Sequence, residues 1–244
     1  MGYWRTLHLF DDRKFYTETV PALKGEKGDL TDDCREFLKT HVVGGTLHLS
    51  KEKLEKLVNK TVEKIISISN SLDKTFKVNN LHQKVVNTND EMVFFNNLEG
   101  YYDFTSFFEY YIFKTCADYF PYIGLGKGGV SRNFKISEKK LSGAIIEELD
   151  DWNNFFCFHG MGITNWMSHD DLQYLYLDKD NLKHDGNEIA KAFLTFLEIA
   201  HTYELCFIMG VDMRDEILQS LPDHKTLRPD LWNLQNLPGL IWSM

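Results

Sequence analysis

The sequence predicts a mainly α-helical fold, α+β at most, in which a bundle of several helices carries a small two-stranded β element near the N-terminus. Two observations predict this class. Apolar residues recur with helical spacing over long stretches, as in amphipathic helices. Alternation with a period of two is clearest in the tetrapeptide Thr-Leu-His-Leu, which occurs at 6–9 and again at 46–49. With 244 residues, 43% hydrophobic, we expect a single domain over 1–244, with a subdivision into 1–90 and 91–244 as the alternative.

The two copies of the tetrapeptide predict two short strands that pair with each other. Each copy alternates and then runs into a charged segment typical of a helix start. Alternation places His8 and His48 on the same strand face as the threonines that precede them. Zinc requires further ligands beyond two histidines, so we expect these side chains to be hydrogen-bonded or solvent-facing.

The remaining segments are predicted to be helical. Thr31 and two aspartates open a helix that runs to Val42, before Gly44 and Gly45. Spacing of apolar residues predicts further helices over 54–72, 103–120, 137–156 and 187–209, with one or two shorter helices between 78 and 99. The glycine run 124–129 lacks the residues and spacing of a phosphate-binding loop and predicts a turn, and the tail from 221 predicts an irregular strap.

Charge is distributed unevenly along the chain. Residues 1–90 carry 15 Lys/Arg and 13 Asp/Glu, a net +2, whereas residues 91–244 carry 12 and 23, a net −11. Such an excess repels nucleic acid and anionic lipid and attracts basic proteins, so we expect neither nucleic acid nor membrane as a partner. The four cysteines form no C-x-x-C pair and the N-terminal segment has no signal-peptide pattern, which predicts free thiols in a cytoplasmic protein.

These features predict a non-enzymatic protein, without a cofactor, that binds a basic protein partner. Immunity and antitoxin proteins, which occlude a basic toxin, are the kind of protein that this charge and size suit. Residues 101–122 contain eleven aromatics, more than one buried helix stripe requires, so some are expected to contact the partner. The predicted partner-binding residues are Glu147, Asp150, Asp151, Asp170, Asp171, Tyr110 and Tyr111.

An enzymatic alternative starts from His201 and Glu204. On a helix over 187–209, Glu204 falls in the middle of the apolar stripe, with His201 one turn back on the same side. A buried carboxylate must be hydrogen-bonded or have a raised pKa. The pair is therefore predicted to be either a structural hydrogen-bonded pair or a general acid and base.

A second candidate site surrounds the adjacent pair His169-Asp170. With His159 upstream and Asp212 or Asp215 downstream, the pair resembles the pattern of the HD phosphohydrolases. The resemblance implies that His159, His169 and Asp170 would hold a divalent metal, which in that family activates water against a phosphoester. The other explanation is a helix start, in which Ser168 is the cap and the acidic residues lie at the positive end of the helix dipole.

Overall fold

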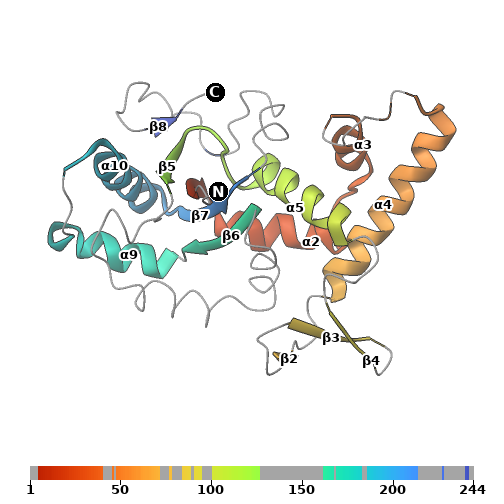
Figure 1. Cartoon of the computed structure of the whole chain (residues 1–244), viewed down its shortest axis with the longest axis horizontal. Helices are drawn as coiled ribbons and strands as arrows, with labels where there is room; N and C mark the ends of the chain where they lie inside the picture. Colours follow the sequence, from red (N-terminus) through yellow and green to blue (C-terminus); the bar gives the residue numbers. More distant parts are fainter. Residues whose placement is uncertain are drawn as a thin grey trace.

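A five-stranded antiparallel sheet forms the centre of the fold (Figure 1). The computed structural model describes residues 5–40, 46, 48–71, 77–78, 84–88, 91–94, 101–126, 162–167, 169–182, 186–213, 227 and 240–241. The strand order is β6-β7-β1-β5-β8. The strands are β1 (Arg5–Phe10), β5 (Tyr122–Gly126), β6 (Gly162–Met167), β7 (Cys206–Val211) and β8 (Leu240–Ile241). The prediction of a mainly helical bundle with a two-stranded element is therefore wrong, and the fold is mixed α and β.

The first Thr-Leu-His-Leu copy forms the central strand, but the second copy does not form a strand. β1 pairs with β5 on one side and β7 on the other. At the second copy, the backbone N–H of Leu49 donates to the carbonyl of Thr46 at 2.9 Å, which makes a turn directly before a helix. The predicted pairing of the two copies is therefore wrong. The two identical tetrapeptides adopt different backbone conformations, because the first copy lies in β1 and pairs with a strand on each side.

A second, three-stranded antiparallel sheet has the order β2-β3-β4. Its strands are β2 (Lys77–Val78), β3 (Lys84–Thr88) and β4 (Glu91–Phe94). The short helices predicted between 78 and 99 are wrong at these positions. The β-branched pair Val85-Val86 favours the extended backbone that the structure has there.

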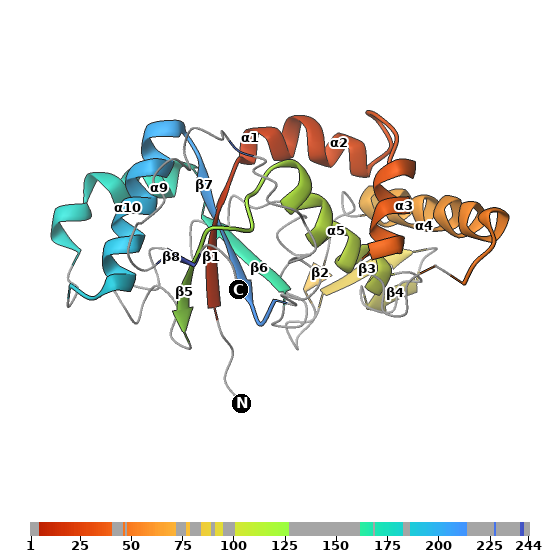
Figure 2. The ribbon, with the colours of Figure 1, turned by 90° about the horizontal axis from the view of Figure 1, so that it is seen from above.

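Helices cover both faces of the central sheet, as Figure 2 shows. Leu9 of β1 pairs in register with Phe207 of β7, so both side chains point to one face, where Phe207 packs against Phe193 of α10 (Glu188–Tyr203). On the other face the ring of His8 contacts Phe113 of α5 (Tyr101–Thr115). Because both faces are covered, residues 7–10 of β1 are all buried.

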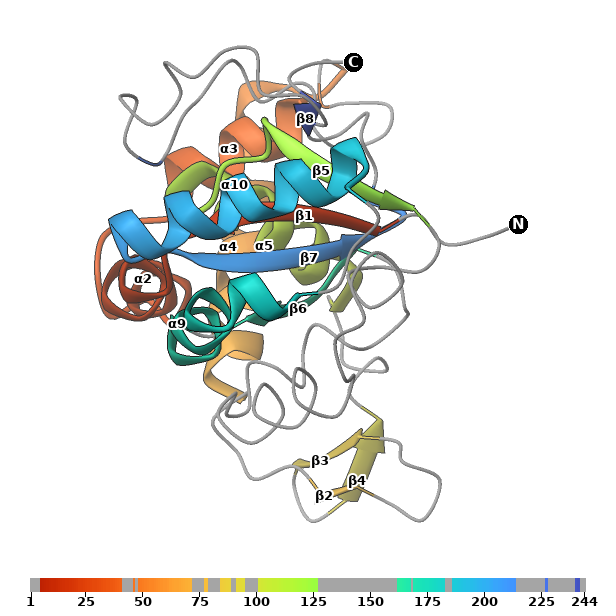
Figure 3. The same ribbon diagram turned by 90° about the vertical axis from the view of Figure 1, so that its left-hand side faces the viewer.

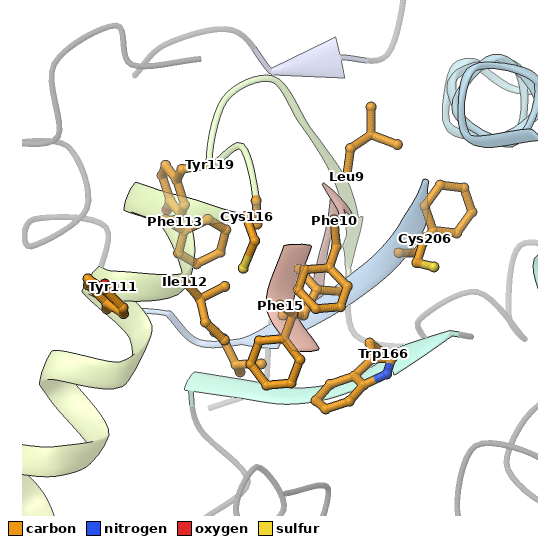
Figure 4. Close-up of a cluster of buried hydrophobic side chains, with 14 of the residues drawn as sticks. Leu9, Phe10, Phe15, Tyr111, Ile112, Phe113, Cys116, Tyr119, Trp166 and Cys206 are labelled. Atoms are coloured by element: carbon orange, nitrogen blue, oxygen red, sulfur yellow. The ribbon is translucent and has the colours of Figure 1, made fainter. Parts of the chain in front are cut away.

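A helical segment follows β1 and closes the aromatic core. It consists of α1 (Asp12–Lys14), a π-helical turn η1 (Phe15–Thr19) and α2 (Val20–Leu23). The Asp11 side chain caps it by accepting from the backbone N–H of Lys14 at 2.9 Å. The fully buried Phe15 packs between Phe10 and Trp166 of β6, with ring centroids 5.6 and 5.4 Å away (Figure 4).

Two of the predicted helices are confirmed, with ends within three residues of the predicted ones. α3 (Thr31–Thr40) and α4 (Lys51–Ser71) pack against each other and against α5. The helix predicted over 187–209 is only partly right, because α10 ends at Tyr203 and the next apolar residues form β7. Part of the predicted glycine turn, up to Gly126, belongs to β5. The helix predicted over 137–156 lies outside the described residues.

The described cysteines are free thiols. Cys34, Cys116 and Cys206 are buried and unpaired by disulfides, which confirms the prediction for these three. Burial raises the pKa of the Cys116 thiol to about 12, so this thiol stays protonated and unreactive near neutral pH. Cys157 lies outside the described residues. Within the described part of the chain, no helix combines the length and the apolar composition needed to cross a bilayer.

Candidate functional site

Helix α9 (His169–Leu177) lies at the periphery of the molecule, on the side away from α3 and α4 (Figure 1). It packs beside α10 and against β7, and Figure 3 shows it next to α10 at the sheet. Leu172 and Leu175, three residues apart, are buried on its inner side. One face of α9 is therefore fixed in the core, and the opposite face is directed to solvent.

A hydrogen-bonded chain of three side chains joins α9 to α10. The amide of Gln173 has its nitrogen 3.1 Å from Nε2 of His169 and its oxygen in contact with Nδ1 of His201. With this amide orientation, Gln173 donates to His169 and accepts from the N–H of His201, which fixes the tautomer of both rings. Tyr176 stacks on His201 with centroids 3.7 Å apart and planes at 10°. Lys179, in the 3₁₀ turn η3 (Lys179–Asn181), places its ammonium 4.0 Å from the Tyr176 ring centre.

The outer side of α9 exposes two large apolar side chains next to an acidic one. Asp170, Tyr174 and Leu177 are spaced i, i+4 and i+7 and therefore share one face, which we call the α9 outer face. Their exposed fractions are large: 89% for the Asp170 side chain, 59% for Tyr174 and 82% for Leu177. Among the described residues only Tyr16 and Leu57 are other exposed large apolar residues, and both are less exposed.

The acidic charge beside this face is only partly offset, by the attraction between Lys179 and Asp180. Among the described residues, neither Asp170 nor the exposed Asp180 forms an ion pair with a lysine or an arginine. Nδ1 of the His169 ring lies 3.8 Å from Oδ1 of Asp170. The α9 outer face thus combines exposed apolar surface with negative charge at both of its ends.

No protein-family model, curated protein or solved structure matches this chain.

The predicted pair His201 and Glu204 is not assembled. No hydrogen bond or ion pair joins these two described side chains; His201 bonds to Gln173 instead. Glu204 lies past the last residue of α10, in a left-handed conformation with φ 55° and ψ 42°. Its side chain is 59% exposed and pairs with Arg13 at 2.7 Å. The expectation of a buried carboxylate is wrong because the helix stops one residue before Glu204.

The predicted metal ligands are only partly within the described residues. His169 and Asp170 both lie in the first turn of α9, and His159 lies outside the described residues. Nε2 of His169 is occupied by Gln173. The described part of the chain contains no group of three or more His, Cys, Asp or Glu side chains that could hold a metal ion. The metal-binding role of His159, His169 and Asp170 stays a prediction.

Of the predicted partner-binding residues, the structure places Asp170 on the surface and the two tyrosines in the core. Tyr110 and Tyr111 are buried, and burial raises the pKa of each to about 12. In this conformation their rings pack against neighbours such as Phe107 and form no exposed patch. Asp171 belongs to α9, but its side chain lies outside the described residues, as do Glu147, Asp150 and Asp151.

The residues that the sequence analysis did not identify are Tyr174 and Leu177. A signal for them is present in the sequence. On a helix that starts at His169, Leu172 and Leu175 define the buried side, and Tyr174 and Leu177 fall on the opposite side with Asp170. Two apolar residues on the polar side of a short amphipathic helix indicate a contact surface.

Proposed function

We propose that this protein is a non-enzymatic binding protein of the cytoplasm that presents an acidic surface to a basic protein partner. Neutralisation of a basic toxin, as by immunity and antitoxin proteins, is the specific role that its charge and size suit. The observation that carries the proposal is the α9 outer face, where Tyr174 and Leu177 stand exposed beside Asp170. Exposed apolar groups next to charge are typical of sites that bind another protein.

The charge of the chain supports a basic partner in particular. Residues 91–244, which include α9, carry 12 Lys/Arg against 23 Asp/Glu, a net −11. A field of this sign accelerates encounters with cationic proteins and disfavours nucleic acid and anionic lipid. After docking, contacts between apolar side chains slow the dissociation of the complex. The buried free thiols support a reducing compartment such as the cytoplasm.

Affinity capture with the immobilised protein tests this function. An extract of the organism that encodes the chain is loaded at low ionic strength, eluted with increasing NaCl, and the eluted proteins are identified by mass spectrometry. We expect a basic protein that elutes as salt rises from about 0.05 M to 0.5 M, because charge steering is screened over this range. A column of an unrelated protein with the same net charge of −9 is the matched control.

Three results contradict the proposal. The first is that every specifically retained protein is acidic or neutral, the second is that the retained basic protein elutes independently of salt, and the third is that it binds the control column equally well. The control column separates binding by this chain from unspecific ion exchange, which any acidic protein supports.

A further inference from the structure

We infer that the α9 outer face docks one amphipathic helix of a basic protein, with an apolar side chain seated between Tyr174 and Leu177 and cationic side chains near Asp170 and Asp180. This inference rests on the proposed function and names the contact site and the chemistry of the partner's contacting segment.

The apolar anchor follows from the spacing of Tyr174 and Leu177. Side chains three residues apart on a helix are neighbours, so their exposed surfaces form one continuous patch. Leu177 is 82% exposed and Tyr174 is 59% exposed, so both residues present a large part of their surface to solvent. A patch of two side chains is small, and it suits one apolar residue of a partner packed between them.

The flanking charges set the sign and the spacing of the partner's polar residues. Asp170 lies at the N-terminal end of α9, and Asp180 lies in η3, just past its C-terminal end. Leu177 lies seven positions after Asp170, a rise of about 10 Å, and Asp180 lies beyond it, so cations on a partner helix need to be at least about two turns apart to reach both ends. Asp178 is less available to a cation of the partner, because its Oδ1 accepts a hydrogen bond from the Asn181 amide at 2.7 Å.

The inner side of α9 makes this surface rigid before any partner binds. Leu172 and Leu175 are in the core, Gln173 bonds to both histidines, and Tyr176 stacks on His201. A surface held in this way loses little conformational freedom on binding, which favours affinity from a small contact area. Lys179 lowers the negative charge of this region without reversing it. Its ammonium lies over the Tyr176 ring and attracts Asp180, but residues 169–181 carry four aspartates against this one lysine.

A helical peptide provides a defined probe for this site. The probe is a fluorescent alanine-based helix of about 15 residues with leucine at its centre and lysines about one turn before and one turn after it. Matched peptides replace the lysines by glutamates or the leucine by serine. Fluorescence anisotropy measures the affinity of each peptide for the full chain at about 0.05 M and 0.5 M NaCl.

Variants of the protein locate the contact. Leu177→Ser is expected to weaken binding of the lysine–leucine peptide about tenfold at both salt concentrations, because it removes the apolar contact. Asp170→Asn is expected to weaken binding a few-fold at low salt only. The matched controls are Leu57→Ser, an exposed leucine on α4, and Glu63→Gln, an exposed acid of the same helix, and both should bind as the unmodified protein does. Thermal unfolding followed by circular dichroism checks that all variants are folded.

Several outcomes overturn the inference. These are failure of the lysine–leucine peptide to bind, equal binding of the glutamate peptide, or an equal loss of affinity in Leu57→Ser and Leu177→Ser. The same variants are then applied to the partner identified by affinity capture. A basic partner that binds with salt dependence but is unaffected by Leu177→Ser and Asp170→Asn contradicts the α9 site and leaves the proposed function standing. Absence of any basic partner contradicts the proposed function itself.

Discussion

Nδ1 of His8 lies 2.8 Å from the carbonyl oxygen of Tyr119. Because a carbonyl only accepts, Nδ1 carries the proton, and Nε2 accepts from the hydroxyl of Thr6 at 2.9 Å. The ring is completely buried and contacts the rings of Phe113, Tyr119 and Tyr122. Both nitrogens are therefore satisfied in the neutral form, inside an aromatic environment that does not solvate charge.

This environment predicts loss of stability in mild acid. Burial lowers the pKa of His8 from 6.5 to about 4. Between these values the unfolded chain binds the proton and the folded chain does not, so the free energy of unfolding decreases as the pH falls from about 6.5 to about 4. The difference between the two pKa values limits the contribution of His8 to the change in the free energy of unfolding to about 3 kcal/mol. Urea unfolding at a series of pH values across this range measures it.

His8→Asn is the control for the pH dependence. Its amide nitrogen replaces Nδ1 as donor to the Tyr119 carbonyl but does not titrate. The variant should be less stable near neutral pH, because the smaller side chain leaves a cavity, and its stability should depend less steeply on pH between 4 and 6.5 than that of the unmodified protein. Equal slopes for the two proteins would assign the acid sensitivity to other groups.

Replacing Gly210 of β7 by alanine is expected to destabilise the protein. It pairs with Thr6 in register, and a Cβ atom built on it would lie 2.1 Å from Sδ of Met213 and 2.8 Å from the Thr6 hydroxyl. Gly210→Ala should therefore destabilise the protein by about 1–3 kcal/mol through overpacking. Urea unfolding near neutral pH measures the change.

A double-mutant cycle identifies the clashing group. Met213→Ala opens the space that the new methyl group needs, so Gly210→Ala should cost less in the Met213→Ala background than in the unmodified protein. An equal cost in both backgrounds would assign the clash to Thr6 and its hydrogen bond to His8 instead.

The helices of the N-terminal half were predictable because each combines a periodic apolar stripe with a clear start. Thr31 precedes two aspartates in the first turn of α3, and α4 follows the periodicity over almost its whole length. The strands were harder to predict. Both faces of β7 lie in the core, so its residues form a continuous apolar run that cannot be distinguished by periodicity from the helix before it.

The end of α10 shows why the sequence places Glu204 wrongly in the core. A helix that ends in a left-handed residue usually has glycine there, whereas this chain has Glu204. Without that signal the apolar pattern extends the helix to 209 and places Glu204 on the apolar stripe. The outer face of α9 can be derived from the sequence once the start of this helix at His169 is known. Tyr174 and Leu177 then lie opposite the buried Leu172 and Leu175.

Lys114 is expected to stabilise the packing of α5 against α3. Its ammonium lies 2.7 Å from Asp33 Oδ1 and 2.5 Å from Glu36 Oε2, and it donates to the Tyr110 hydroxyl at 3.0 Å. Lys114→Met removes the cation from between two carboxylates and should destabilise the protein by about 1 kcal/mol, between the values typical of exposed and of buried pairs. Urea unfolding at low salt measures the loss. Adding Asp33→Asn should recover part of the loss, whereas no recovery would show that lost packing, not unpaired charge, is responsible.

The left-handed conformation of Glu204 predicts that glycine stabilises this position. Among the described residues only Glu204 and Asp212 have positive φ without being glycine. The conformation belongs to the helix end, because the backbone N–H of Leu205 bonds to the carbonyl of Ala200 at 2.9 Å across the left-handed residue, and the chain then turns from α10 into β7. Glu204→Gly removes the Cβ strain, and it should raise the free energy of unfolding by about 0.5 to 1 kcal/mol.

The ion pair with Arg13 opposes this gain only weakly. Both side chains are mostly exposed, at 64% and 59%, so solvent and salt screen their attraction. Glu204→Gln is the matched variant, because it removes the charge and keeps the Cβ atom. Thermal unfolding in about 1 M NaCl, where the ion pair contributes least, should order the proteins with glycine most stable and with glutamate and glutamine nearly equal. A glycine variant less stable than the glutamine variant would mean that residue 204 is not held in the left-handed region in solution, and that α10 ends elsewhere.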